Sequence, residues 1–336
     1  MASSPLTRSP CPDWPASWPK GHTARVDFTR PAASAGEPSG RAGRTPRWRR
    51  YVAVGDSFTE GLWDVPGGGV PAGVTGGDGG PADVRCRGWA DLLSAHLAER
   101  VADAQRDRAQ GVAQDVAQDA TGDAEPFRYA NLAVRGRLLR PILREQVPAA
   151  AELGPDLVSV VGGGNDLLRP GADPDVLADA LEGAVAGLRR SGIDVLLATG
   201  FDTVHSPVIR RTRGRTAVFN AHIWTIAHRH GAYVLDMWGM RSLQDWRMWA
   251  DDRIHLTTDG HRRVAQAALV ALGLAPDDER WDDPLAPLPP VPVAARVRAD
   301  AVWLRAHASP WLSRRLHGRS SGDGRPPKRP ELTPVG

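Results

Sequence analysis

The stretch Tyr51–Gly61 reads YVAVGDSFTEG, and it combines the end of a predicted strand with a polar turn. Four mostly apolar, β-prone residues lead into Gly55, Asp56 and Ser57. Gly, Asp and Ser are ordinary turn residues, so one interpretation is a simple strand-to-loop connection. The other interpretation is that Ser57 is a nucleophile held at the edge of a sheet. The tripeptide alone does not decide, so the partners of Ser57 must come from elsewhere in the chain.

Outside this stretch, predicted strands and helices alternate along the chain. Short apolar runs predict strands at 50–55, 128–134, 156–161, 193–199 and 232–236. Helical patterns separate these strands, and the last one covers 257–274. Continuous apolar strands that alternate with helices indicate a parallel sheet covered on both faces. The prediction is therefore a three-layer α/β/α, flavodoxin-like sheet of about five parallel strands.

Three further motifs follow predicted strand ends or precede the last helix. Open parallel sheets bind ligands beyond the carboxyl ends of their strands, so this is where partners of Ser57 belong. NLAVRG places Gly136 in a turn after the second strand, and VVGGGNDLL places Asn165 after the third. DDRIHLTTDGH carries Asp252 three residues ahead of His255. Each motif is weak alone, but the four in this order form a strong combined signal.

The order Ser, Gly, Asn and Asp-x-x-His resembles the GDSL family of esterases and lipases, also called SGNH hydrolases. The resemblance covers about residues 49–275 and is closest to cytosolic actinobacterial members. It implies the SGNH hydrolase fold and a serine hydrolase that cleaves small-molecule carboxylic esters, with no cofactor. Phe58 stands where the family motif has Leu, at a position that packs.

The chemistry of ester cleavage explains why these residue types belong together. The Ser57 hydroxyl is a weak nucleophile and needs a base within hydrogen-bond reach. His255 suits this role because its pKa lies near neutral pH, and Asp252 can fix its tautomer and stabilise the imidazolium. The resemblance implies three oxyanion-hole donors: the backbone N–H groups of Ser57 and Gly136, and the side-chain amide of Asn165.

Other polar residues near these motifs have structural interpretations. His261 falls inside the last helix and is interpreted as a surface or packing residue. Asp56 and Asp166 are expected to brace their turns. Arg135 and Arg137 either favour an anionic substrate or pair with acidic residues of the body, and we favour the pairing. The histidines of HRH at 228–230 lack the spacing of a zinc-binding helix, so no metal site is predicted.

The substrate side of the cleft is poorly defined by the sequence. Trp63, Trp89 and Trp238 are candidates to line an acyl pocket, although most tryptophans pack in cores. The Gly-rich loop 65–85 follows the nucleophile and is a candidate lid. The same catalytic residues also fit an acyltransferase or a thioesterase. A rival from another class is a non-catalytic binding protein, but such a protein has no need of Asp-x-x-His.

Composition limits the remaining function classes. The chain has 336 residues, a net charge of +3 and two cysteines, Cys11 and Cys86, without metal-ligand spacing. No run of about eighteen apolar residues is present, so no membrane span is predicted. The N-terminus lacks the apolar segment of a secretory signal, and a cytoplasmic location is the expectation.

Charge and composition divide the chain into four expected parts. These are a disordered basic tail at 1–47, the hydrolase domain at 48–275, a Pro-rich strap with a docking helix at 276–318, and a basic tail at 319–336. Both basic ends could contact nucleic acid, but no nucleic-acid-binding motif appears, so we interpret them as solvated. The first 46 residues and the last eighteen should then be dispensable for ester cleavage. The sequence leaves the oligomeric state open.

Overall fold

The computed structural model describes residues 46–67, 86–115, 125–204, 206, 209–308, 320 and 322–335. Within these ranges a six-stranded sheet has the order β5-β4-β3-β1-β2-β6. The strands are β1 (Arg50–Gly55), β2 (Arg128–Asn131), β3 (Leu157–Val161), β4 (Asp194–Ala198), β5 (Tyr233–Leu235) and β6 (Arg329–Pro334). Strands β1 to β5 pair in parallel, which confirms the predicted parallel sheet.

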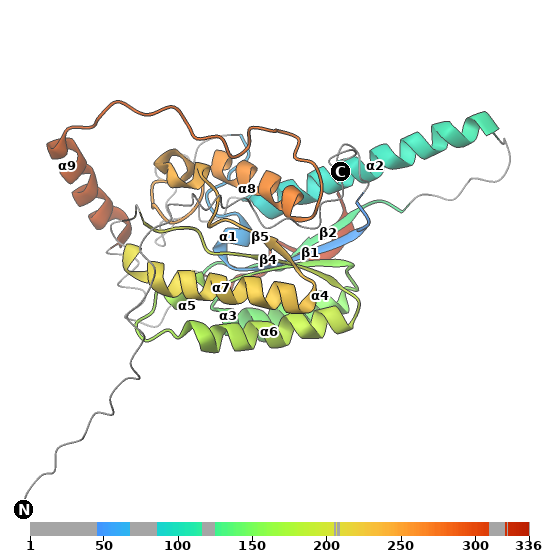
Figure 1. Ribbon diagram of the computed structural model, residues 1–336, viewed down its shortest axis with the longest axis horizontal. Helices are drawn as coiled ribbons and strands as arrows, with labels where there is room; N and C mark the ends of the chain where they lie inside the picture. Colours follow the sequence, from blue (N-terminus) through green and yellow to red (C-terminus); the bar gives the residue numbers. More distant parts are fainter. Residues whose placement is uncertain are drawn as a thin grey trace, which may run out of the picture. The chain divides into compact units, whose positions relative to one another are not determined.

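Helices lie on both faces of this sheet (Figure 1). The helices of the described ranges are α1 (Ser57–Glu60), α2 (Trp89–Asp115), α3 (Leu139–Pro141), α4 (Val147–Glu152), α5 (Gly164–Leu167), α6 (Pro174–Arg190), α7 (Arg213–His230), α8 (Thr258–Ala271) and α9 (Val293–Trp303), of which α9 lies away from the sheet. A π-helical turn, Ile142–Gln146, joins α3 to α4, and a second one, Leu304–Ala308, continues α9. Short 3₁₀ turns occupy Arg210–Thr212, Ser242–Gln244 and Trp246–Met248.

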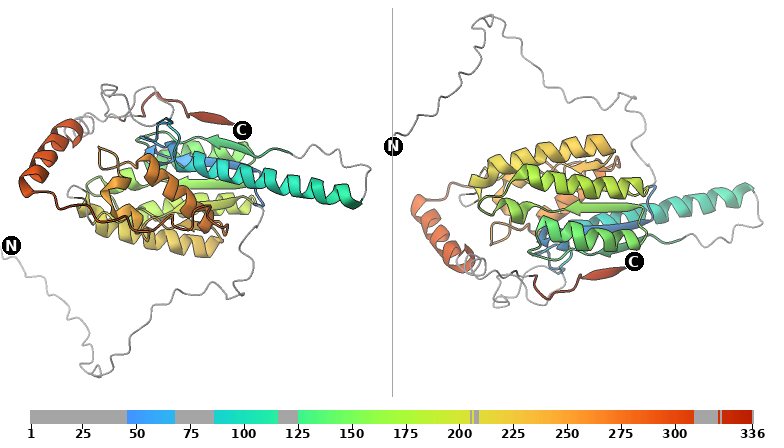
Figure 2. Two further views of the ribbon diagram at one scale, coloured as in Figure 1. Left: turned by 90° about the horizontal axis from the view of Figure 1, so that it is seen from above. Right: turned by 90° about the horizontal axis from the view of Figure 1, so that it is seen from below.

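Strand β1 shows how the two helical layers are held. Successive side chains of a strand point to opposite faces. Tyr51 and Ala53 therefore join one core cluster, with residues of α2 and α8. Val52 and Val54 join the other cluster, with residues of α6 and α7. Figure 2 shows the same two layers from above and below. Burial on both faces explains why the strand reads as a continuous apolar run.

The C-terminal segment differs from the sequence prediction. The residues expected as a basic tail include β6, which pairs antiparallel with β2 and adds a sixth strand to the sheet. Pro330 and Pro334 hid this strand, because proline cannot donate to a strand ladder and argues against an interior strand. As an edge strand, β6 tolerates both prolines.

Two segments that the sequence singled out lie mostly outside the described ranges. These are residues 1–45 and 68–85, so the disordered tail and the glycine-loop lid stay predictions.

Helix α9, near the C-terminus, contacts the loop of Asp252 and His255. Asp300 pairs with Arg253 at 2.7 Å, and Trp303 is buried. Across the described ranges, no helix is both long and apolar enough to cross a membrane.

Candidate active site

The turn after β1 presents Ser57 at the start of α1. Gly55 is required by close packing, because an added Cβ would lie 2.5 Å from the carbonyl oxygen of Val161 at the end of β3. Asp56 is the N-cap of α1, and its Oδ1 accepts a hydrogen bond from the backbone N–H of Phe58 at 3.1 Å. Gly-Asp-Ser is therefore a tight strand-to-helix turn that leaves the serine at the carboxyl end of a central strand.

The buried side chain of Gln146 holds the same turn from the other side. Its Oε1 accepts from the Gly55 N–H at 2.7 Å, and its Nε2 donates to the Gly55 carbonyl at 3.0 Å. Gln146 comes from the π-helical turn that precedes α4. No sequence motif pointed to Gln146. Its only signal was a polar side chain on the apolar side of a predicted helix.

His255 links Ser57 to Asp252. Its Nε2 lies 2.8 Å from Ser57 Oγ, and its Nδ1 lies 2.5 Å from Asp252 Oδ2. The other carboxylate oxygen of Asp252 accepts from the backbone N–H groups of Ile254 and His255, each at 3.0 Å. The structure thus brings the three predicted catalytic residues together, and Asp252 fixes both the imidazole and its loop.

The loop that carries this pair is anchored on both sides. Arg253, between Asp252 and His255, has a left-handed φ of 59°, which turns the chain sharply there. The N–H of Ala250 donates to the His255 carbonyl at 2.8 Å, and Thr257 caps α8. The imidazole therefore projects from a short loop whose two ends are tied to regular structure.

Charges and burial set the protonation states of these groups. Burial alone would raise the pKa of Asp252, but the charge and hydrogen bonds of His255 hold it at about 2. Burial alone would lower the pKa of His255, but the Asp252 carboxylate outweighs it and raises the pKa above its usual value. Burial raises the pKa of Asp56 to about 6. Asp252 is therefore ionised at neutral pH, and it accepts a hydrogen bond from the protonated Nδ1 of His255.

Two of the predicted oxyanion residues, Gly136 and Asn165, lie in segments that contact the turn of Ser57. Gly136 has a left-handed φ of 73°, a conformation that favours glycine. Nδ2 of Asn165 donates to Asp56 Oδ2 at 3.1 Å and to the Arg137 carbonyl at 3.0 Å. The amide of Asn165 thus bridges the residue before Ser57 and the residue after Gly136.

Asp166, the neighbour of Asn165, accepts from the backbone N–H of Leu139 at 2.8 Å. This contact ties the loop after β3 to the start of α3, so Asp166 braces its loop as predicted.

Arg135 pairs with Glu60, the last residue of α1. The Arg135 Nε donates to Glu60 Oε1 at 2.9 Å, and its backbone N–H donates to Glu60 Oε2 at 2.7 Å. Both side chains are largely buried. Arg137 pairs with Glu145 at 3.3 Å on a more exposed part of the surface. Of the two interpretations of these arginines, the structure supports pairing with acidic residues of the body.

His261 packs behind the site as a neutral histidine. Its Nδ1 accepts from the backbone N–H of Trp89 at 3.2 Å, and its Nε2 donates to the Leu62 carbonyl at 3.5 Å. Only one ring nitrogen carries a proton in this arrangement. Burial lowers the pKa of His261 to about 4. This confirms the interpretation of His261 as a packing residue and leaves His255 as the histidine next to Ser57.

The histidine-rich end of α7 is occupied by ion pairs. His230 and Arg229 both bind Glu182, at 2.8 Å and 2.5 Å. In the part of the chain that the structure describes, no group of three or more His, Cys, Asp and Glu side chains could hold a metal ion.

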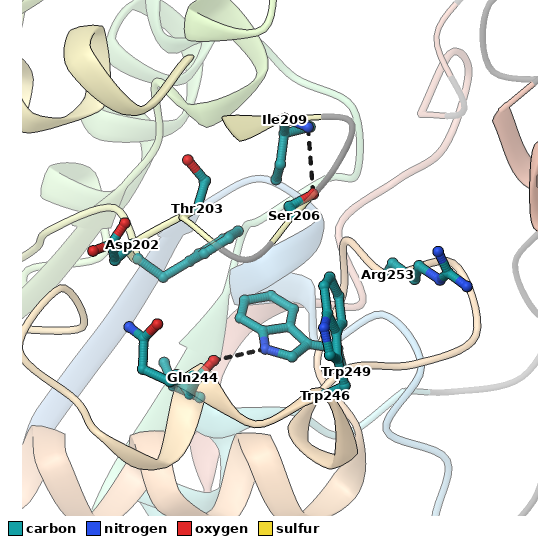
Figure 3. Close-up of a pocket in the computed structure, with 10 residues that line it drawn as sticks. Asp202, Thr203, Ser206, Ile209, Gln244, Trp246, Trp249 and Arg253 are labelled. Atoms are coloured by element: carbon teal, nitrogen blue, oxygen red, sulfur yellow. Dashed lines mark hydrogen bonds between the residues drawn. The ribbon is translucent and has the colours of Figure 1, made fainter. Parts of the chain in front are cut away.

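A pocket opens beside the loop of Asp252 and His255 (Figure 3). Its wall includes Phe201, Trp246, Trp249 and Arg253. Phe201 and Trp249 pack with ring centroids 4.3 Å apart. The tryptophans of this pocket are not those that the sequence suggested. Trp89 is instead fully buried in the core.

Comparison with protein-family models matches residues 53–263 to the GDSL-like Lipase/Acylhydrolase family. The chain belongs to this family. The match spans more than half of the chain and includes every residue of the Ser57–His255–Asp252 group. Membership makes this GDSL-like protein an esterase-type hydrolase.

Several solved structures are similar to this GDSL-like chain. LAE5, an alpha/beta hydrolase enzyme from the metagenome of Lake Arreo, Spain, is 24% identical, with a TM-score of 0.48 over 66% of this chain and 94% of its own. A variant of Axe2, an acetyl xylan esterase from Geobacillus stearothermophilus, is 17% identical, with a TM-score of 0.46 over 69% and 97%. TesA is 21% identical, with a TM-score of 0.41 over 66% and 97%. A search of curated protein sequences gave no match.

Proposed function

We propose that this protein hydrolyses carboxylic esters through an acyl-enzyme on Ser57. The observation that carries the proposal is the continuous chain of contacts from Ser57 Oγ to His255, at 2.8 Å, and from His255 to Asp252, at 2.5 Å. A serine hydroxyl in contact with an oriented imidazole is the arrangement that activates a weak nucleophile.

In the first half-reaction, Ser57 Oγ attacks the ester carbonyl carbon while His255 Nε2 takes the hydroxyl proton. The imidazolium formed is stabilised by the ionised Asp252, whose pKa is held at about 2. His255 then gives this proton to the leaving alkoxide as the tetrahedral intermediate collapses. In the second half-reaction, a water molecule attacks the acyl-enzyme with His255 again as the base, and Ser57 is regenerated with its proton.

The oxyanion of each tetrahedral intermediate needs preorganised donors. We assign this role to the backbone N–H groups of Ser57 and Gly136 and to the amide of Asn165. The Asn165 contacts with Asp56 and Arg137 support the assignment, because they keep the amide between the chain segments of the other two donors. Donation to the oxyanion requires that one of these two hydrogen bonds is given up when the substrate reacts.

The experiment that tests this function is active-site labelling with a fluorophosphonate, combined with a screen of nitrophenyl esters from acetyl upward. We expect stoichiometric labelling of wild type, no labelling of Ser57→Ala, and turnover of at least one ester. Thioesters and added acceptor alcohols in the same screen separate hydrolysis from thioester cleavage and acyl transfer. A folded wild-type protein that is neither labelled nor active on any ester would overturn the proposal.

The pair of variants Ser57→Ala and His255→Ala tests whether the two residues act as a unit. Each should remove nearly all turnover, and the double variant should be scarcely worse than either single one. Additive losses would show that a residue other than His255 is the base.

A further inference from the structure

The segment that contains β6 forms the edge strand of the sheet, next to β2. Three residue pairs define its register with β2: Arg128 with Pro334, Tyr129 with Thr333, and Asn131 with Arg329. Leu332 of β6 also packs against one of the two core clusters. The residues before β6 are therefore fixed in position relative to β1 and β2.

Lys328, directly before β6, places its ammonium group among four oxygens. Its Nζ donates to the carbonyl oxygens of Glu60 at 2.5 Å, Arg87 at 2.6 Å and Cys86 at 3.0 Å, and to Asp91 Oδ2 at 2.6 Å. The Lys328 side chain is only 13% exposed. An ammonium group has three N–H donors in a tetrahedral arrangement, which suits binding to several carbonyls at once.

Asp91, in the first turn of α2, shows that this is a buried charge pair. Burial raises the pKa of Asp91 to about 6, and the charge of Lys328 opposes that rise. Removal of the ammonium would leave the Asp91 carboxyl buried without this counter-charge, which is unfavourable for its ionised form.

The contact of Lys328 with Glu60 is linked to Ser57 through helix α1. Glu60 is the last residue of α1, which has four residues and begins at Ser57. A cation at the carboxyl end of a helix also interacts favourably with its exposed carbonyls. Lys328 therefore holds the opposite end of the helical turn that presents the Ser57 hydroxyl.

The same C-terminal segment also contacts the chain next to Gly136. Gly322 is buried, and a Cβ added to it would collide with the carbonyl oxygen of Arg135. Arg135 is the partner of Glu60. The segment thus touches both members of the ion pair that joins α1 to the loop of Gly136.

We propose that Lys328 is a positioning residue for the Ser57 hydroxyl, an inference that rests on the proposed esterase function. By binding the Glu60, Cys86 and Arg87 carbonyls, it fixes the tilt of α1 and with it the alignment of Ser57 Oγ on His255 Nε2. Displacement of a reacting group by about 1 Å can cost on the order of 100-fold in rate, so a loosened α1 lowers kcat.

The test compares Lys328→Met with Leu332→Ala. Lys328→Met keeps the aliphatic stem and loses the ammonium. Leu332→Ala weakens the packing of the same strand against the core cluster that contains no residue of α1. We expect Lys328→Met to lower kcat about tenfold or more, with KM within about twofold of wild type. Leu332→Ala should lower Tm but keep kcat within about twofold.

Amide hydrogen exchange supplies a readout that does not depend on activity. The N–H groups of Glu60, Gly61 and Leu62 donate to carbonyls of Asp56 and Ser57. These amides should exchange faster in Lys328→Met than in Leu332→Ala. If wild type hydrolyses no ester, the proposed function fails, while the exchange comparison still decides whether Lys328 holds α1.

The proposal is overturned if the two variants show the same kcat and the same exchange of these amides. Should Lys328→Met not fold, Lys328→Arg decides, since it keeps the charge facing Asp91 but replaces the tetrahedral donors with a planar group. We then expect a loss of about threefold or more in kcat with unchanged KM and faster exchange of the α1 amides. Wild-type kcat and exchange in Lys328→Arg would overturn the proposal.

Discussion

Asn165 combines a contact role in the resting protein with its proposed role toward the oxyanion. Its amide donates to Asp56 and to the carbonyl of Arg137, so both amide hydrogens have partners before substrate binds. Loss of the side chain therefore removes a brace as well as an oxyanion donor. The two effects are separable, because the brace acts on stability and the donor acts on the transition state.

We predict that Asn165→Ala lowers kcat by roughly 10²–10³ with little change in KM, the usual cost of one lost oxyanion donor. Its Tm should fall as well. The matched control is Asp166→Ala, which removes the bond to the Leu139 N–H from the same loop. It should lower Tm but keep kcat within a few-fold. Unchanged kcat in Asn165→Ala would remove this residue from the mechanism.

The pKa of His255 sets the acidic limb of the pH profile. The base must be neutral to accept the Ser57 proton, so activity rises as pH increases through the pKa of His255. That pKa lies above its usual value because the Asp252 carboxylate outweighs burial. Asp56, with a pKa of about 6, titrates nearby and interacts with His255, so the limb belongs to a coupled group.

We predict that Asp252→Asn moves this acidic limb to lower pH. Burial of His255 persists in the variant, whereas the charge that raises its pKa is gone. The maximal rate should also fall by on the order of 10³-fold or more, because the tautomer and the imidazolium lose their partner. Profiles of kcat/KM from pH 5 to 9 provide the measurement. A limb at the wild-type pH would show that Asp252 does not set the pKa of His255.

At the scale of elements, the turn that carries Ser57 is stabilised by contacts with neighbouring segments. Helix α1 has four residues, too few for a stable isolated helix. The π-helical turn before α4 contributes Gln146, which satisfies both backbone polar groups of Gly55. A buried backbone group without a partner costs about 1–3 kcal/mol, so this side chain stabilises the turn.

We predict that Gln146→Leu lowers the free energy of unfolding by about 2 kcal/mol or more and lowers kcat several-fold at constant KM. Leu143→Ala is the matched control, since Leu143 lies in the same turn and packs against the core without reaching Gly55. It should destabilise the protein and leave kcat nearly unchanged. Denaturant unfolding together with steady-state kinetics would contradict the prediction if the two variants lost kcat equally.

At the scale of the whole molecule, the sequence predicted the features that local patterns encode. The apolar runs of β1 and β3 are buried on both faces, so they read as strands of a parallel sheet. Ser57, Asp252 and His255 follow from short motifs at predicted strand and helix ends. Gln146 and Lys328 carry no such pattern, because their partners are backbone groups far away in the chain. Strand β6 was missed because its prolines contradict an interior strand.

The pairing of β6 with β2 argues against the expectation that the last eighteen residues are dispensable. We predict that a chain ending at residue 318 has a Tm lower by roughly 5 °C or more, because it loses the β6 pairing and the Lys328 contacts. Its kcat on a nitrophenyl ester should fall as in Lys328→Met. A chain beginning at residue 46 is the control, since it keeps the bond from Trp48 to Asp194 and should match full length. Equal Tm for both truncations would contradict this prediction.

The pairing of β6 with β2 also has a consequence for biosynthesis. Lys328 and Glu60 are separated by 268 positions, so the ribosome makes the nucleophile turn long before the residue that holds it. Closing so long a loop adds little to the conformational-entropy cost of folding, but contacts between residues so far apart in the chain form slowly. Until β6 has emerged, the edge of β2 is open to pairing with other chains. A nascent chain with five strands therefore passes through an interval in which its sheet edge is exposed and the turn of Ser57 lacks its contact with Lys328.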